Sequence, residues 1–402
     1  MTLVADGALS TLRVLDLSLA IPGPYCAGLM AGLGAEVIKV EPLQGDPARR
    51  CGPFFQDDPH PEKSGLFLYV NQGKKSITLN LETETGRGIF RRLARDVDVV
   101  LESFQPGYLA GIGLGYSDLE QINPGLVLTS VTPFGQDGPH RGWKGNELVN
   151  YALSGQMYLF GDPDKEPLKT GGSIGQFFGG MMAFTAGMTA LFSRRVTGEG
   201  QHVDVSITEA IASMVEGATS AWQYVGQVMG RTANQGRMAA EGQYLCKDGF
   251  VQVSTVVGNN ASFQRFQDLM GVPALGDPKF ATPEGRTEHR AELDALMQPW
   301  LSAHTKLDIY QMAQAVRLPF GYVCTTEDLL SSPQFLEREY FVELDHPFTG
   351  PLKYPGAPYK MSETPWQARR APLLGEHNEE IYCGRLGYSR QELALLCANG
   401  VI

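Results

Sequence analysis

The side chains that could carry out chemistry are spread along the chain without the spacing of a common catalytic motif. None of the seven histidines belongs to HExxH or to another pair spaced like metal ligands, which argues against a catalytic metal. The six cysteines form no CxxC pair, so we expect reduced thiols that mostly fill the core. The nucleophile turn of a serine hydrolase, GxSxG, does not occur either.

Two pairs of adjacent cations could meet phosphate groups. Arg49 lies next to Arg50, and Lys74 next to Lys75. Guanidinium and ammonium groups both donate hydrogen bonds to phosphate oxygens. For any one of these four residues, a solvated position on the surface is the commoner outcome.

Alternating strands and helices must position any site in the first part of the chain. Helices are predicted near 25–33 and 84–95. A strand–helix–strand unit of about 30 residues implies parallel pairing with a right-handed crossover. We therefore predict an α/β region with Rossmann-like topology. Its strands are predicted at 12–18, 35–41, 76–81, 97–103 and 126–132.

Neither NAD nor ATP is supported as a ligand of this region. The turn after the first strand reads SLAIPGPYCAG, with Pro22 and Pro24 where a dinucleotide turn needs free backbone N–H groups. The P-loop pattern GxxxxGK[ST] is also missing.

The middle of the chain differs from the first part in its pattern of predicted helices and strands. Residues 177–195 predict a buried helix that ends in two arginines. A strand-like run at 250–255 and helices near 260–271 and 286–317 then indicate a smaller second domain. A short helix is predicted at 389–397.

Composition narrows the class of protein. The chain has 402 residues, 43% hydrophobic and 19% charged, which fits folded domains rather than disorder. The 33 Lys and Arg against 44 Asp and Glu give 33 − 44 = −11, which opposes a general nucleic-acid or anionic-membrane role. We see no signal peptide and no apolar run of the roughly 18 residues that span a bilayer, so we expect a soluble, cytoplasmic protein.

Six segments, in order, cover nearly the whole chain. They are residues 12–49, NQGKKSITLNL (71–81), VLESFQPGYLAGIGLGY (100–116), INPGLVLTSVTPFGQDGP (122–139), TGEGQHVDVSITEA (197–210) and PLLGEHNEEI (372–381). Together they resemble the family III CoA-transferases, the group that contains formyl-CoA transferase, carnitine CoA-transferase and α-methylacyl-CoA racemase.

The resemblance implies a Rossmann-like large domain with a parallel sheet, plus a smaller α+β domain. It also implies a dimer whose subunits interlock as rings. On this basis residues 1–212 begin the large domain, 213–328 form the small domain with its linkers, and 329–402 return to the large domain.

The same resemblance implies that CoA binds mainly to the large domain. The matching positions are Ala20, Ile21, Leu79, Asn80, Ser103, Phe104, Gln105 and Lys144. The ammonium of Lys144 suits a CoA phosphate as a point charge. For Leu79 and Phe104, ordinary packing is an equally good interpretation.

In the transferases of this family, an aspartate carboxylate attacks the acyl-CoA thioester and gives a mixed anhydride and CoA thiolate. The thiolate then forms an aspartyl-CoA thioester, which the acceptor carboxylate opens. The segment GGSIGQFFGGMM places Gln176 at the position of that aspartate. A neutral amide is a very poor nucleophile, and loss of a covalent nucleophile costs on the order of 10⁶ in rate. We therefore expect essentially no covalent transfer through residue 176.

Glu147 matches a glutamate found beside the transferase nucleophile, although a capping or solvated carboxylate is also plausible there. In the racemase branch, a histidine and an aspartate exchange protons in the stretch that aligns with KGNELVNYALSG. Here those positions carry Asn146 and Glu147, so two-base exchange lacks a partner and racemase activity is disfavoured.

Three hypotheses follow, all with CoA or acyl-CoA as ligand and with no metal, and the first also takes a carboxylic acid. The chain is the subunit of a heteromeric CoA-transferase that lacks the nucleophile, beside a paralogue that supplies the aspartate. Alternatively, it is a homodimeric lyase or isomerase that uses Glu147 as base, or a non-catalytic acyl-CoA-binding protein. We favour the first, and the sequence does not indicate the acid.

Overall fold

The computed structural model describes residues 7–232, 239–254 and 260–402. The chain forms two compact units, and each is considered by itself. The first contains Met1–Gln156, Thr170–Glu216 and Glu337–Ile402, and the second contains Met157–Lys169 and Gly217–Leu336. The first unit is therefore built from three separate stretches of sequence.

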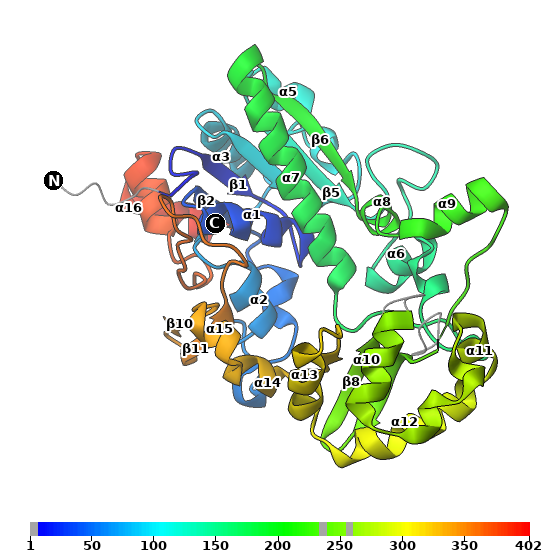
Figure 1. The fold of residues 1–402 in the computed structure, drawn as a ribbon. Coiled ribbons are helices and arrows are strands. Elements are labelled where there is room, and N and C mark those ends of the chain that lie inside the picture. The colour runs from blue at the N-terminus through cyan, green and yellow to red at the C-terminus, as the bar shows by residue number, and fades with distance from the viewer. Residues whose placement is uncertain (1–6, 233–238, 255–259) are drawn as a thin grey trace. The chain divides into compact units, whose positions relative to one another are not determined.

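A six-stranded parallel sheet forms the centre of the first unit (Figure 1). Its strands are β1 (Arg13–Asp16), β2 (Glu36–Glu41), β3 (Lys75–Thr78), β4 (Val99–Glu102), β5 (Val127–Thr132) and β6 (Gln201–Ser206). Their order, β3-β2-β1-β4-β5-β6, is that of a Rossmann fold. In register, Val14 pairs with Val37 on one side and with Val99 on the other. The predicted α/β class is confirmed.

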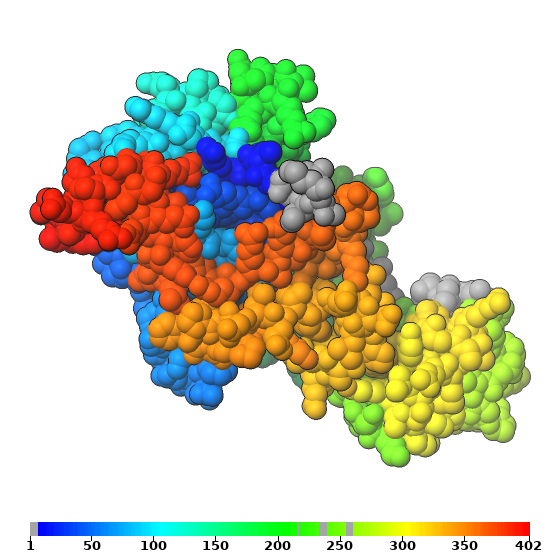
Figure 2. All heavy atoms as spheres, turned by 90° about the vertical axis from the view of Figure 1, so that its left-hand side faces the viewer, coloured from blue at the N-terminus to red at the C-terminus, as the bar shows by residue number. Residues whose placement is uncertain are grey.

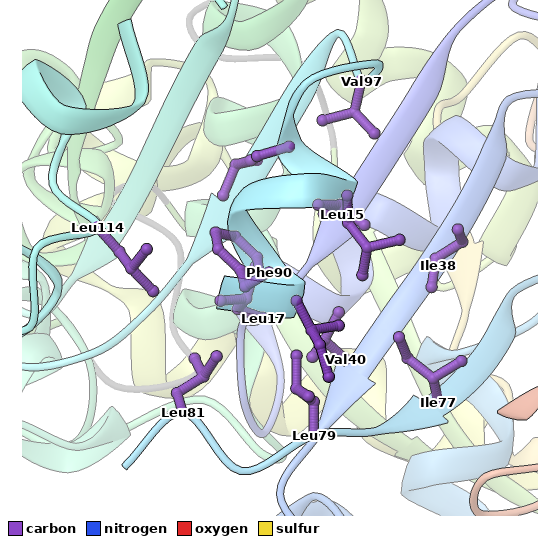
Figure 3. Packing of buried hydrophobic residues seen from close by; sticks show 14 of the residues in the cluster. Leu15, Leu17, Ile38, Val40, Ile77, Leu79, Leu81, Phe90, Val97 and Leu114 are labelled. Carbon is purple, nitrogen blue, oxygen red and sulfur yellow. The ribbon is translucent and has the colours of Figure 1, made fainter. Parts of the chain in front are cut away.

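The central strands are buried because their side chains are covered on both faces of the sheet. On one face, Leu15, Ile38 and Val40 pack with Phe90 of α3 (Glu84–Ala94), as Figure 3 shows. On the other side lie α1 (Pro22–Gly32) and α7 (Ile174–Thr197), which pack closely along one another (Figure 1).

Helix α1 begins at Pro22, three residues before the predicted start. Proline is tolerated in the first helical turn because the N–H that it lacks would have no partner within the helix. The two prolines therefore open the helix rather than break it.

The other elements of the first unit are short. They are α2 (Gly65–Val70), α4 (Tyr108–Gly111), α5 (Tyr116–Glu120), α6 (Glu147–Leu153), α8 (Ile207–Ala212), α16 (Arg390–Ala398), the antiparallel hairpin β10 (Phe341–His346) and β11 (Gly350–Pro355), the 3-10 turns Pro47–Arg50 and Phe55–Asp57, and a π-helix at Glu379–Arg385.

The C-terminal stretch accepts hydrogen bonds from the edge strand β3 and from the residues that follow it. The backbone N–H of Thr78 donates to Asn378 Oδ1 at 3.0 Å, and that of Asn80 donates to the Val401 carbonyl at 2.8 Å. Tyr382, Val401 and Ile402 join the apolar core beneath the sheet. Figure 2 shows this orange-to-red segment beside the blue N-terminal part of the unit.

The second unit has an antiparallel sheet with the order β7-β8-β9, formed by Glu241–Cys246, Gly249–Ser254 and Gly321–Tyr322. Its apolar core includes Phe266, Phe280 and Met297. Its helices are α10 (Asn260–Met270), α11 (Pro283–Glu288), α12 (Arg290–Ala303), α13 (Lys306–Ala315) and α14 (Thr326–Ser331), with α9 (Glu216–Val225) and α15 (Pro333–Glu337) at the boundaries and 3-10 turns at Gln156–Leu159, Pro273–Gly276 and Pro278–Phe280.

Two expectations about cysteines and membranes can be compared with this fold. All six cysteines are free, but only Cys26 and Cys246 are buried, so the prediction that most of them fill the core was wrong. In the ranges that the structure describes, no helix is both long and apolar enough to cross a membrane.

Candidate functional site

A cavity of about 410 Å³ opens where strands β1 to β4 end. The carboxyl ends of parallel strands are the usual ligand position in such sheets, because the loops that follow the strands diverge there. Three residues that the family resemblance assigned to CoA meet in this cavity: Leu79, Asn80 and Phe104. The full lining is Leu17, Leu19, Val40, Pro42, Leu43, Gln44, Leu79, Asn80, Leu81, Glu82, Phe104 and Tyr108.

The turn that carries Ala20 and Ile21 lies beside this cavity. Ala20 has φ of 64°, in the left-handed region that a residue with a side chain rarely adopts. Its backbone N–H donates to Asp46 Oδ1 at 3.1 Å, and the N–H of Leu19 donates to Ser103 Oγ at 2.8 Å. Ser103 thus supports the turn instead of lining the cavity, and Ile21 is the residue that precedes α1.

A buried network of ion pairs supports the turn that carries Ala20 and Ile21. The Lys39 ammonium lies 2.8 Å from Asp46 Oδ2 and donates to the Ser18 carbonyl at 2.8 Å. Lys74 lies 2.7 Å from Asp16 Oδ2. Burial by itself would raise the pKa of Asp16, but the charges of Lys39 and Lys74 outweigh it and hold that pKa below its usual value. Burial lowers the pKa of Lys74 to about 8, although Asp16 opposes the shift.

In each of the two cation pairs, one residue is buried and the other is nearer to solvent. Arg49 is 1% exposed and Lys74 is 4% exposed, so the expectation of a solvated surface was wrong for both. The Arg49 guanidinium donates to both oxygens of Glu41 at 2.8 Å and lies 3.6 Å from the centre of the Phe67 ring. A buried cation needs such partners because an unpaired charge in the core is very costly. These side chains stabilise the fold.

Their neighbours are nearer to solvent. Lys75 is partly exposed and pairs with Glu36 at 2.8 Å and with Glu380 at 2.7 Å. Arg50 is exposed and donates to the backbone carbonyl of Gln44 at 3.0 Å. Because Gln44 lines the cavity, Arg50 is the member of the two pairs that stands next to its lining.

Sequence reasoning missed most of the cavity lining. Pro42, Leu43 and Gln44 directly follow β2, and Tyr108 begins α4. The signal was available for the first three, since residues after a parallel strand reach the ligand edge of a sheet. The Tyr108 hydroxyl donates to Glu82 Oε1 at 2.5 Å. Burial, together with Glu82, raises the pKa of Tyr108 to about 12.

The three predicted catalytic positions come together at the start of α7. Gly175 and Gln176 are in the first turn of this helix, and their backbone N–H groups donate to the two carboxylate oxygens of Glu147, each at 3.0 Å. Asn146 caps α6, because its Oδ1 accepts from the N–H of Val149 at 3.0 Å. A negative charge at a helix N-terminus is favourable, so Glu147 acts as a cap for α7.

The approach of α7 to its neighbours is close. A Cβ on Gly175 would lie 2.5 Å from the Ile211 side chain and 3.0 Å from Glu147 Oε2. Any larger residue at position 175 would therefore disturb the contact with Glu147. Gln176 itself is partly buried.

The remaining two predicted ligand positions do not line the cavity. Gln105 follows Phe104, and its carbonyl accepts from the N–H of Tyr108 at 3.0 Å. Lys144 is exposed in the loop between β5 and α6.

A Rossmann-type sheet with a cavity at its carboxyl edge places the protein in the class of α/β proteins with Rossmann-like topology. The family model for CoA-transferase family III matches residues 9–378. The chain therefore belongs to CoA-transferase family III.

Individual relatives agree with this assignment. The chain is 36% identical to a succinyl-CoA–D-citramalate CoA-transferase of Chloroflexus aurantiacus and 35% identical to subunit BbsE of the succinyl-CoA:(R)-benzylsuccinate CoA-transferase of Thauera aromatica, over 98% of both chains in each case. A crystal structure of a CaiB/BaiF family protein from Brucella suis superposes with a TM-score of 0.85 at 30% identity, covering 94% of this chain and 99% of the other.

Proposed function

We propose that this chain is the subunit of a heteromeric CoA-transferase that lacks the nucleophile, and that a second family III chain supplies the aspartate. The complex would move CoA between two carboxylic acids, as a cytoplasmic dimer with interlocked subunits. The observation that carries the proposal is Gln176, a neutral amide in the first turn of α7 at the position matched to the family aspartate.

The surroundings of Gln176 support the proposal. Both oxygens of Glu147, the adjoining carboxylate, accept backbone N–H groups of α7. A carboxylate held in this way positions the helix rather than attacks a thioester, and the same bonds disfavour a role for Glu147 as a general base. We therefore rank the lyase or isomerase hypothesis lower.

The residues around the cavity at the strand ends suit the binding of CoA. The cavity at the strand ends has an apolar wall, including Leu79 and Phe104, that can hold an adenine ring, while Asn80 adds a polar group. We propose that Arg50 and Lys144, both exposed, meet the CoA phosphates.

Two relatives suggest how the enzyme is assembled and what it uses. The Thauera aromatica relative is named as a subunit, and both that protein and the Chloroflexus aurantiacus relative are named for succinyl-CoA. We propose succinyl-CoA as the donor to test first.

The test is to produce the chain alone and together with a family III chain that has aspartate at the position of Gln176. Each preparation is assayed with succinyl-CoA and a set of acceptor acids. We expect a mixed complex with transferase turnover, no turnover by this chain alone, and loss of turnover when the partner's aspartate is changed to asparagine. Full turnover by this chain alone would overturn the proposal, and binding of CoA without turnover in any pairing would favour the binding protein.

A further inference from the structure

Two loops at the carboxyl edge of the parallel sheet supply part of the lining of the cavity at the strand ends. The turn after β1 contributes Leu19, and the loop after β2 contributes Pro42, Leu43 and Gln44. Because both loops line the same cavity, its shape depends on how firmly each loop is held relative to the other.

Asp46 joins the two loops through one buried carboxylate. It lies two residues after Gln44 and is 0% exposed. Its Oδ1 accepts from the backbone N–H of Ala20 at 3.1 Å and from that of Ala48 at 2.8 Å. Its own backbone N–H donates to Oε2 of Glu41, the last residue of β2, at 2.9 Å. The same residue is thus bonded to the turn after β1 and to the loop after β2.

Each of these loops contains a residue in the left-handed region of backbone conformation. Ala20 has φ of 64°, and Gly45, next to Asp46, has φ of 77°. Glycine adopts this conformation freely, whereas the Cβ of alanine makes it unfavourable. A strained residue persists only where the surrounding contacts fix it. The hydrogen bond from the Ala20 N–H to Asp46 is such a contact.

An ion pair fixes the carboxylate itself. Lys39 Nζ lies 2.8 Å from Asp46 Oδ2, and both side chains are fully buried. Lys39 also donates to the Ser18 carbonyl at 2.8 Å, two residues before Ala20. Hydrogen bonds to an ionised acceptor are stronger than those between neutral groups. Since Asp46 is buried, it can influence a ligand only through the loops that it holds.

We propose that Asp46 is a positioning residue for CoA. It holds the turn at Ala20 and the loop that carries Gln44 in the arrangement that forms the cavity. Loops that are ordered before the ligand arrives lose less conformational entropy on binding, so the affinity for CoA depends on this carboxylate. The inference rests on the proposed function, because it takes the cavity at the strand ends to be the CoA site.

The experiment measures the affinity for CoA by calorimetry and the stability of each protein by urea denaturation. The proteins are the wild type, Asp46→Ala, Ala20→Gly, the double variant with both changes, Ala20→Pro and the control Glu62→Gln. Glu62 belongs to the same buried charge network, but its carboxylate bonds to Arg49 and to the backbone N–H of Leu374 instead of to the turn. Affinities are compared only for variants that the urea curves show to be folded.

Asp46→Ala should bind CoA about tenfold more weakly, the usual effect of losing one hydrogen bond to a buried charged group. Adding Ala20→Gly should bring the affinity back to within about threefold of the wild type, because glycine keeps the turn without that bond. Ala20→Pro should also lose about tenfold, since proline cannot adopt a positive φ. Glu62→Gln should lower stability and leave the affinity unchanged.

Unchanged affinity in Asp46→Ala, with stability lost, would show that Asp46 only stabilises the fold and would overturn the inference. A loss that Ala20→Gly does not restore would overturn it as well, because the effect would not pass through the turn. Should Asp46→Ala fail to fold, Ala20→Pro decides, since normal CoA binding by that variant rules out a role for the turn. Failure of the wild type to bind CoA would instead overturn the proposed function, and the inference with it.

Discussion

The cavity at the strand ends and the start of α7 lie in the same unit. They differ in whether they contain the residues that the family resemblance predicts for them. The cavity brings together Leu79, Asn80 and Phe104 beside a turn that a buried ion network supports. At α7, the neutral side chain of Gln176 lies at the position where the family resemblance predicts the nucleophile, and Glu147 is engaged as a cap. In the proposed function, recognition of CoA is therefore distributed over many residues of the core, whereas reactivity depends on a single group. Under this proposal, one substitution removes reactivity and leaves recognition intact.

The largest expected effect comes from restoring that group. Gln176→Asp places a carboxylate at the start of α7, where it can attack a thioester. After incubation with succinyl-CoA, we expect this variant to carry a covalent CoA thioester, and its turnover to rise by several orders of magnitude above a wild type that is essentially inactive. Intact-protein mass spectrometry detects the adduct.

Gln176→Asn is the control, because it shortens the side chain without adding charge. An adduct on the wild type, or on Gln176→Asn, would show that another residue acts as the nucleophile and would remove the contrast between the two regions.

The next effect concerns the network beneath the cavity. Lys74 contacts Asp16, the Pro24 carbonyl and the Asn71 side chain at 2.7–2.8 Å, whereas Lys75 makes partly exposed pairs. Lys74→Met should lower the free energy of unfolding by about 3–5 kcal/mol because Asp16 loses a buried partner. Lys75→Met should cost only about 0–1 kcal/mol. Urea denaturation of the two variants compares them directly, and similar losses would mean that the network does not hold the turn.

A smaller, pH-dependent effect is expected at Glu102, at the end of β4. Burial raises the pKa of this carboxyl, even though its Oε2 accepts from the N–H of Phe104 at 2.7 Å. The folded state then binds the proton more tightly than the unfolded state, so Glu102 lowers stability as the pH rises from about 4.5 through its raised pKa.

Glu102→Gln keeps an acceptor for Phe104 and removes the titration. We expect this variant to be more stable than the wild type by about 1 kcal/mol at neutral pH, with the difference vanishing near pH 4. Thermal denaturation across this pH range measures it, with the exposed Glu120→Gln as control. A constant difference at all pH values would exclude titration of Glu102 as its cause.

The smallest effect is expected at Lys144. Since this side chain is exposed, Lys144→Met should weaken CoA binding about threefold at low salt and less at high salt, because ions screen an exposed charge pair. Calorimetry at two ionic strengths measures the change, with the exposed Lys353→Met as control. Unchanged binding at low salt would exclude Lys144 from the CoA site.

The central strands could be predicted because both faces of each are buried and their sequences are rich in valine and other β-branched or aliphatic residues. Strand β6, QHVDVS, was missed because it is an edge strand whose residues are mostly exposed and polar. Its pairing with β5, from Val127 opposite Gln201 onward, depends on residues far away in the sequence.

The site was predictable only in part, and for a similar reason. Leu79, Asn80 and Phe104 follow strands, and the family resemblance pointed to them. The sequence did not distinguish the buried Arg49 from the exposed Arg50. Arg49 is buried because it donates to Glu41, Glu62 and the Pro372 carbonyl, and the fold alone brings these partners together.

The dependence of β3 on the C-terminal stretch has a consequence for biosynthesis. Ser76, Thr78 and Asn80 take their partners 300 or more positions later in the sequence. At about 5–20 residues per second, a ribosome needs roughly 15–60 s to deliver those partners after β3 has emerged. During that interval the nascent chain presents an unpaired strand edge, the kind of surface that chaperones shield and that promotes aggregation.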